Sequence, residues 1–163
     1  MTIFLPILIL IQFGLVRYLR KWLRGDGYSL SHNNSAFVLV HQKQFDEAEK
    51  LINFAMQKNG GSPHELSLLA ICKSNKGENE KAKKIIKGAE FYGGRKHTHA
   101  IINFSKSIIC FNCKDIQGGK EYLKKAIELK EKEIKKYIGF SGIIKDLRAS
   151  NPQIENIFKE YEK

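Results

Sequence analysis

Apolar residues recur at intervals of three and four along residues 31–137, which is the spacing of one face of an α-helix. Segments 33–43 and 46–58 form a first pair, in which Phe45, Ala48, Leu51 and Ala55 share a face. Two further pairs follow, 64–76 with 80–90 and 98–113 with 117–137. No proline interrupts residues 64–151, which favours helix. The pattern predicts an all-α fold of three helical hairpins.

Small residues occupy equivalent places in the second segment of each pair. They stand at steps of 34 and 37 residues, at Ala48 and Ala55, Ala82 and Ala89, and Gly119 and Ala126. Two helices can cross closely only where no large side chain separates their backbones. Because one hairpin cannot bury its apolar face alone, we expect the three to stack around a continuous core. The alternative is an ordinary helical bundle in which this spacing is accidental.

These residues carry a resemblance to the tetratricopeptide repeat (TPR) family. Phe45-Asp46-Glu47-Ala48 with Ala55 resembles the turn and second helix of such a repeat. Leu69, Gly77, Ala82 and Ala89 resemble a second copy, and Ala126-Ile127-Glu128-Leu129 resembles the end of a third. Gly119 replaces an alanine usual in the family, and the resemblance covers roughly residues 31 to 130. It implies a right-handed α-solenoid whose first helices line a concave groove.

The resemblance also implies which residues line that groove and bind a partner. They are Asn33, Phe37, Val40, His41, Ser67, Ile71, Ser74, Asn75, Phe104, Ile108, Phe111 and Asn112. Family members that clamp a carboxylate use charged side chains, whereas the matching positions here are Asn33, Phe37, Ile71, Phe104 and Ile108. The expected guest is therefore an apolar helix or extended peptide. Alternatively, some of these side chains pack against neighbouring helices.

The first 24 residues predict a membrane anchor. Residues 2–16 contain no charge, and extension to Leu19 gives about 27 Å of helix, slightly less than a bilayer core of roughly 30 Å. The basic residues follow the apolar run, which places the repeats of a single-pass protein on the cytoplasmic side of the membrane. A cleaved signal peptide and a helix lying in the interface are the alternatives. The expected interface residues are Arg17, Tyr18, Arg20, Lys21, Trp22 and Arg24.

The rest of the chain divides into three parts. Residues 25–30 read as a flexible hinge, 31–138 as the repeat domain and 139–163 as C-terminal capping helices. Gly139-Phe140-Ser141-Gly142 breaks the preceding helix, and Asn151-Pro152 resembles a helix N-cap followed by a proline in the first turn. The last helices are expected to cover the third hairpin, with docking to a partner as the alternative.

The net charge of +11 is shared between the anchor and the repeats. The first 24 residues carry +4, and the remaining 139 carry +7 with both signs mixed. Such a mixture is typical of solvated helix faces, with attraction to acidic lipids or an acidic partner as the alternative. Nucleic acid is disfavoured, because no nucleic-acid-binding motif occurs.

Cys110-x-x-Cys113 is the strongest candidate for chemistry. A redox pair of this kind needs a βαβ setting, and a zinc site needs four ligands, whereas Cys72, His97 and His99 fit no standard spacing. Three cysteines also argue against a disulfide framework. Phosphate-binding, metalloprotease and nucleophile motifs are missing from the sequence. We therefore expect no enzyme activity, no metal and no cofactor.

The sequence thus predicts a membrane-tethered scaffold or adaptor that binds a protein partner through an apolar groove. A second hypothesis is an import or assembly receptor of an organellar outer membrane, whose groove would take amphipathic targeting helices. A third is a cysteine-based metal or redox protein.

Overall fold

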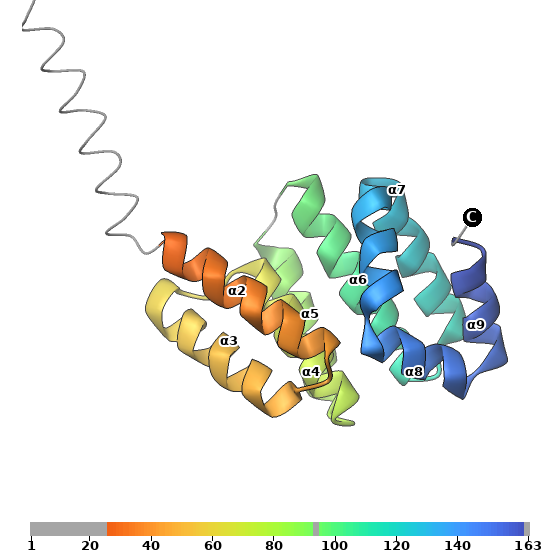
Figure 1. Cartoon of the computed structure of the whole chain (residues 1–163), viewed down its shortest axis with the longest axis horizontal. Helices are drawn as coiled ribbons and strands as arrows, with labels where there is room; N and C mark the ends of the chain where they lie inside the picture. The colour runs from red at the N-terminus through yellow and green to blue at the C-terminus, as the bar shows by residue number, and fades with distance from the viewer. Residues whose placement is uncertain (1–25, 93–94, 162–163) are drawn as a thin grey trace, which may run out of the picture.

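The computed structural model describes residues 26–92 and 95–161, and these residues form helices and no strand. The expected all-α class is confirmed for this part of the chain. From α2 to α7, consecutive helices run in opposite directions and stack side by side, and α8 and α9 follow (Figure 1). They are α2 (Asp26–His41), α3 (Phe45–Asn59), α4 (Pro63–Asn75), α5 (Asn79–Phe91), α6 (Lys96–Asn112), α7 (Ile116–Phe140), α8 (Gly142–Ser150) and α9 (Pro152–Lys159).

The turns inside the three hairpins share one backbone geometry. Lys43, Gly77 and Lys114 have φ values of 66°, 82° and 63°, and each follows the end of a first helix. In each turn the next N–H donates to the carbonyl five residues back, as from Gln44 to Leu39 at 2.9 Å. This pattern is the Schellman motif. The three turns stand 34 and 37 residues apart, so the backbone repeats the period of the small residues.

This geometry makes Lys114 a site for stabilisation. A left-handed φ is unfavourable for a residue with a side chain, and the Lys114 side chain is exposed. Lys114→Gly should therefore raise the free energy of unfolding by up to about 1 kcal/mol, measured by urea denaturation. Lys84→Gly, in the interior of α5, is the matched control and should lower it by about 1 kcal/mol. A loss of stability in both variants would contradict the turn geometry.

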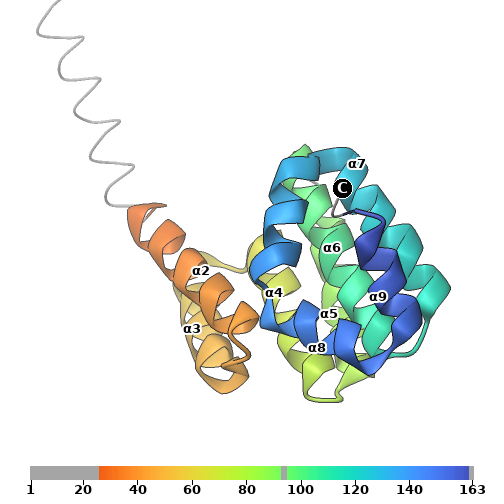
Figure 2. The ribbon, with the colours of Figure 1, turned by 45° about the vertical axis from the view of Figure 1, so that its right-hand side comes forward.

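The helix boundaries differ from expectation in two places. α2 begins at Asp26, so residues 26–30, predicted as a hinge, are helical. α7 is bent at Lys130, where φ and ψ are −152° and 65°, although no proline or glycine lies there. Beyond this bend, the second part of α7 turns across α6 and toward α2 before α8 begins (Figure 2). The sequence had predicted one continuous helix over residues 117–137.

Local capping explains where several helices begin. Ser62 accepts a hydrogen bond from the Glu65 N–H, and the Glu65 carboxylate accepts one from the Ser62 N–H, with Pro63 in the first turn of α4. Asn151 caps α9 through its side chain and is followed by Pro152, as the sequence predicted. Each of these bonds satisfies an N–H that has no partner within its own helix.

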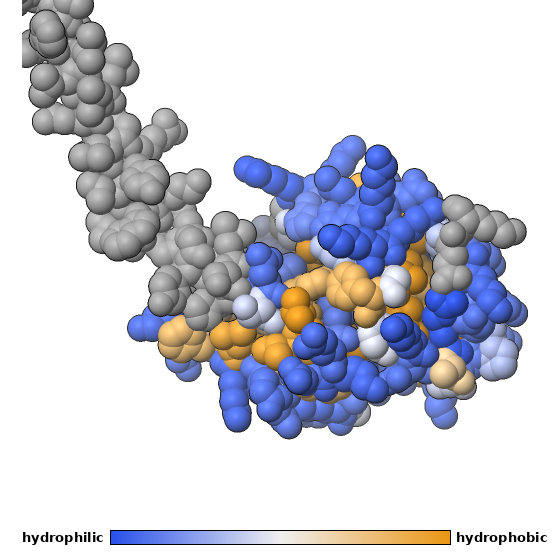
Figure 3. All heavy atoms as spheres, in the orientation of Figure 1, coloured by the Kyte–Doolittle hydropathy of each residue, from blue (hydrophilic) through white to orange (hydrophobic). Residues whose placement is uncertain are grey.

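The main apolar core extends from α2 to α9. It combines buried residues of the hairpins with Ile134, Ile138, Ile144 and Phe158 from the end of the chain. The small residues of the repeat, Gly119 among them, are also buried, as expected. Hydrophilic side chains cover most of the face shown in Figure 3. Apolar side chains gather along α2 and toward the middle of this face.

Candidate functional site

The first helices of the three hairpins place the expected groove residues on a common inner surface. Of the twelve residues, Val40, His41, Ser67, Ile71, Ser74, Phe104, Ile108 and Phe111 are buried. Phe37, Asn75 and Asn112 are half-buried, and the side chain of Asn33 lies outside the described part. The first helices thus form an inner surface, but most of its residues are buried in this structure.

The chain's own C-terminal part covers this surface. The Tyr137 ring lies 4.7 Å from that of Phe37 and 6.0 Å from that of Phe104, measured between centroids. At the third hairpin, the Phe158 ring lies 5.7 Å from that of Phe111. The expected open groove is therefore filled by residues 131–140, α8 and α9, which we call the C-terminal segment. The physical reason is that its apolar face would otherwise be left in water.

Asn75 and Asn112 of the expected groove form hydrogen bonds inside the protein. Asn112 donates to the Ser74 hydroxyl at 3.0 Å, and Ser74 donates to Asn79 at 3.1 Å. Asn75 donates to the Ile71 carbonyl at 2.9 Å. The bond of Asn112 joins the third hairpin to the second, whereas the other two lie within the second hairpin. Their polar atoms are thus already used for internal packing.

A polar cluster lies where the C-terminal segment meets α2. His41 Nδ1 lies 2.8 Å from the Ser141 hydroxyl, which also caps α8. Both side chains are buried, and His41 Nε2 has no hydrogen-bond partner among the described residues. A serine–histidine pair can act in nucleophilic catalysis, but no substrate can reach this one, and its role is to join α2 to α8.

A second polar group connects α6 to the bent part of α7. The Tyr137 hydroxyl donates to Glu133 at 2.5 Å, and His97 Nδ1 lies 3.0 Å from the other oxygen of that carboxylate. Burial is the main cause that holds the pKa of Tyr137 well above its usual value, and the hydrogen bond to Glu133 raises that pKa further. Sequence reasoning missed Glu133, Tyr137 and Ser141, because each also contacts a residue far away along the chain: His97, Phe37 and His41, respectively.

Two histidines of this region make the fold sensitive to acid. Burial lowers the pKa of His41 to about 4, with a smaller effect from His64. Burial also lowers the pKa of His64 to about 4, with His97 adding to it and Glu133 opposing it. Both imidazoles are therefore neutral in the folded protein at pH 7.

We expect the free energy of unfolding to fall as the pH drops from about 6.5 to 4. The unfolded chain binds protons at the ordinary histidine pKa, whereas the folded chain resists them until about pH 4. Each pKa unit between the two states corresponds to about 1.4 kcal/mol. His41→Gln and His64→Gln should each flatten this slope in urea titrations at several pH values. A slope equal to that of the wild type would assign the acid sensitivity to other groups.

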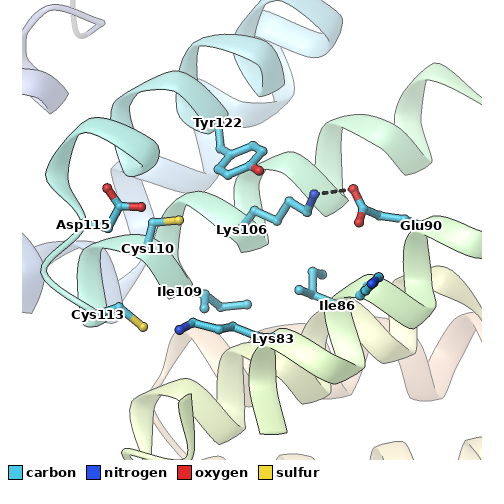
Figure 4. A pocket seen from close by; sticks show the side chains of 10 residues that line it. Lys83, Ile86, Glu90, Lys106, Ile109, Cys110, Cys113, Asp115 and Tyr122 are labelled. Atoms are coloured by element: carbon cyan, nitrogen blue, oxygen red, sulfur yellow. Dashed lines mark hydrogen bonds and ion pairs between the residues drawn. The ribbon is translucent and has the colours of Figure 1, made fainter. Parts of the chain in front are cut away.

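A separate cleft of about 390 Å³ lies between α5, α6 and α7 (Figure 4). Its floor contains the buried Ile86 and Ile109, and Lys106 lies 4.7 Å above the Tyr122 ring while pairing with Glu90. Lys83 is likewise paired, with a carboxylate of its own helix at 2.8 Å. Lys87 also lines the cleft and forms no ion pair among the described residues, but a single exposed lysine does not define a ligand.

The three cysteines are free, and two of them line this cleft. Burial raises the pKa of Cys110 to about 11, with further contributions from Asp115. Burial likewise raises the pKa of Cys72 to about 12. Both thiols are protonated at neutral pH and are poor nucleophiles. Among the described residues, no group of three or more potential ligands could hold a metal ion.

The expected anchor and its interface residues, from Arg17 to Arg24, lie outside the described residues. Within residues 26–92 and 95–161, no helix combines the length and apolar character that a membrane span requires.

Comparison with protein-family models, curated proteins and solved structures gives no match. The candidate site therefore has to be interpreted from its geometry.

Proposed function

We propose that this protein is a membrane-tethered, TPR-like scaffold or adaptor whose concave face binds an amphipathic helix of a protein partner. The observation that supports this is the occupant of that face. Residues 131–140 and α8 place Ile134, Tyr137, Ile138 and Ile144 against the inner surface, with Lys132, Lys136 and Lys145 exposed. The surface thus accepts a helix with one apolar and one polar side.

A partner helix would have to replace the chain's own helix. The internal segment competes at a high effective concentration because it is covalently attached. The partner's apparent affinity is consequently reduced in proportion to the fraction of molecules in which the face is open. Binding is therefore regulated by the strength of the internal contact. The buried Ser141–His41 pair and the protonated thiols agree with a binding protein rather than an enzyme.

A locked C-terminal segment provides the test. Lys43 Nζ lies 2.6 Å from Asp146 Oδ2, so cysteines at these two positions can be joined by a short bifunctional thiol reagent. The background should lack the native Cys72, Cys110 and Cys113. Proteins crosslinked to the unlocked chain in native membranes would then be identified by mass spectrometry. We expect the locked chain to lose them.

Two controls complete the experiment. The single variants Lys43→Cys and Asp146→Cys, treated with the same reagent, should retain the partner. Equal recovery of the partner by the locked and unlocked chains, both folded, would place its binding outside the concave face.

An import or assembly receptor of an organellar outer membrane is the second candidate. Amphipathic targeting helices are basic, and a basic surface would repel them. The internal occupant is itself rich in lysine, and those lysines point to solvent. This arrangement favours the candidate, since a basic helix can occupy the face without burying its charges. Imaging of the tagged full chain would separate the two, because only the receptor requires an organellar location.

A further inference from the structure

One edge of the molecule contains the start of α2, the end of α5 and the start of α6 (Figure 1). The first helices of all hairpins begin at this edge because successive helices alternate in direction. The bend of α7 also lies here, since His97 in the first turn of α6 contacts Glu133 at 3.0 Å. We call this the α5–α6 edge and define it by Phe91, Tyr92, Arg95, Lys96, Lys130 and Lys132.

Two aromatic side chains at this edge are unusually exposed. Phe91 is 93% and Tyr92 61% exposed. Folding buries almost none of Phe91 and leaves most of Tyr92 in solvent, although both are large and apolar enough to be stabilised by burial. Aromatic side chains beside basic ones are typical of proteins that insert into the headgroup layer of a membrane.

Several cations on the other side of the molecule are paired with carboxylates, whereas those of this edge have no such partner among the described residues. On that other side, Lys43, Lys73, Lys76 and Lys81 each pair with an acidic side chain. Arg95, Lys96 and Lys132 are exposed and form no ion pair with the described carboxylates. Lys130 is also exposed. Its charge favours the ionised form of the Glu133 carboxylate, which is already hydrogen-bonded to His97 and Tyr137.

The remaining chain leads to the same edge. Residues 1–25 precede α2, and they include the uncharged run 2–16 and four basic residues before Asp26. If this part enters a bilayer, the point where it joins α2 brings the α5–α6 edge to the membrane surface. Basic residues near such a surface bind anionic lipids.

We propose that the α5–α6 edge is a lipid-contacting surface, with Phe91 and Tyr92 in the headgroup layer and Arg95, Lys96, Lys130 and Lys132 on anionic lipids. This inference rests on the proposed membrane tether and adds the orientation of the repeats on the bilayer. The inner surface and its C-terminal segment would then remain accessible from the side.

A single tryptophan can report the contact. Trp22 is the only tryptophan of the chain, so Phe91→Trp in a Trp22→Phe background gives one fluorophore. The full chain would be reconstituted into vesicles of phosphatidylcholine with or without phosphatidylserine. We expect blue-shifted emission, and quenching by lipids brominated near the headgroups, in the vesicles that contain phosphatidylserine.

Matched variants determine what the signal means. Gln42→Trp, exposed beside the α2–α3 turn on the opposite edge, should show neither effect. Arg95→Glu with Lys96→Glu should abolish the quenching of the tryptophan at position 91. Charge reversal at two exposed lysines elsewhere, Lys50→Glu with Lys145→Glu, should leave this quenching unchanged.

The outcomes separate this inference from the tether. If the wild-type chain does not float with vesicles, both proposals fail. If it floats while the tryptophan at position 91 is quenched no more than that at position 42, only the lipid-contacting edge is overturned. If the quenching survives charge reversal at Arg95 and Lys96, the proposed contact between these cations and anionic lipids is overturned. A blue shift produced by an acidic protein or nucleic acid, but not by vesicles, would assign the edge to that partner.

Discussion

Ile144→Asp is expected to abolish stable folding of the hairpins, although Ile144 lies outside them. Its side chain is fully buried in the core that α8 shares with α2, α4 and α6. An unpaired carboxylate in this position should lower the free energy of unfolding by about 4 kcal/mol or more. A loss of that size is comparable to the whole stability of a small domain. Circular dichroism during urea denaturation would measure it.

The neighbouring residue supplies the control. Lys145 is exposed on the same helix, and Lys145→Asp should change the free energy of unfolding by no more than about 0.5 kcal/mol. If Ile144→Asp unfolded with the same midpoint as Lys145→Asp, the C-terminal segment would not be part of the core.

Gly119→Ala should destabilise the protein even though alanine is the better helix former. A Cβ atom at position 119 would overlap the Phe111 ring, which is itself buried. Overpacking of this kind costs about 1–3 kcal/mol and outweighs the gain in helix propensity of about 1 kcal/mol. The same urea denaturation would measure the net loss.

Gly88→Ala is the matched substitution in α5. Nothing lies within 4 Å of a Cβ atom at position 88, so the free energy of unfolding should rise by about 0.5–1 kcal/mol. Gly119→Ala combined with Phe111→Leu should recover part of the loss, because leucine removes the ring. Equal effects of alanine at positions 88 and 119 would mean that α6 and α7 do not approach as closely as described.

The hairpins could be predicted from sequence because their signals are local. Helical spacing and a proline-free stretch depend only on neighbours along the chain, and the steps of 34 and 37 follow from comparing the chain with itself. The structure repeats that period in the turns at Lys43, Gly77 and Lys114. Gly119 departs from the expected alanine for a reason that sequence alone does not contain, the position of the Phe111 ring.

The filled inner surface could not be predicted in the same way. Ile134, Tyr137 and Ile138 have helical spacing, which identifies an apolar face but not the surface that covers it. The bend at Lys130 carries no proline or glycine, so no local residue indicated that the chain would turn there. Burial of the apolar face beyond the bend, including the fully buried Ile134, is the energetic reason that we find for it.

The same reasoning explains His41 and the asparagines. The family resemblance assigned them to a groove that binds a guest. The structure instead uses His41 to join α2 to Ser141 and Asn112 to join the third hairpin to the second, while Asn75 bonds within α4. Buried polar residues and binding residues have similar compositions. Only the three-dimensional partners distinguish them.

The most direct test of the account is the nuclear Overhauser effect between aromatic side chains of the full chain. With Phe and Tyr rings labelled, we predict cross-peaks from Tyr137 to both Phe37 and Phe104, whose ring centroids lie 4.7 and 6.0 Å away. A well-dispersed spectrum that lacks both cross-peaks would show a folded repeat stack with its inner surface open, and would contradict the central claim.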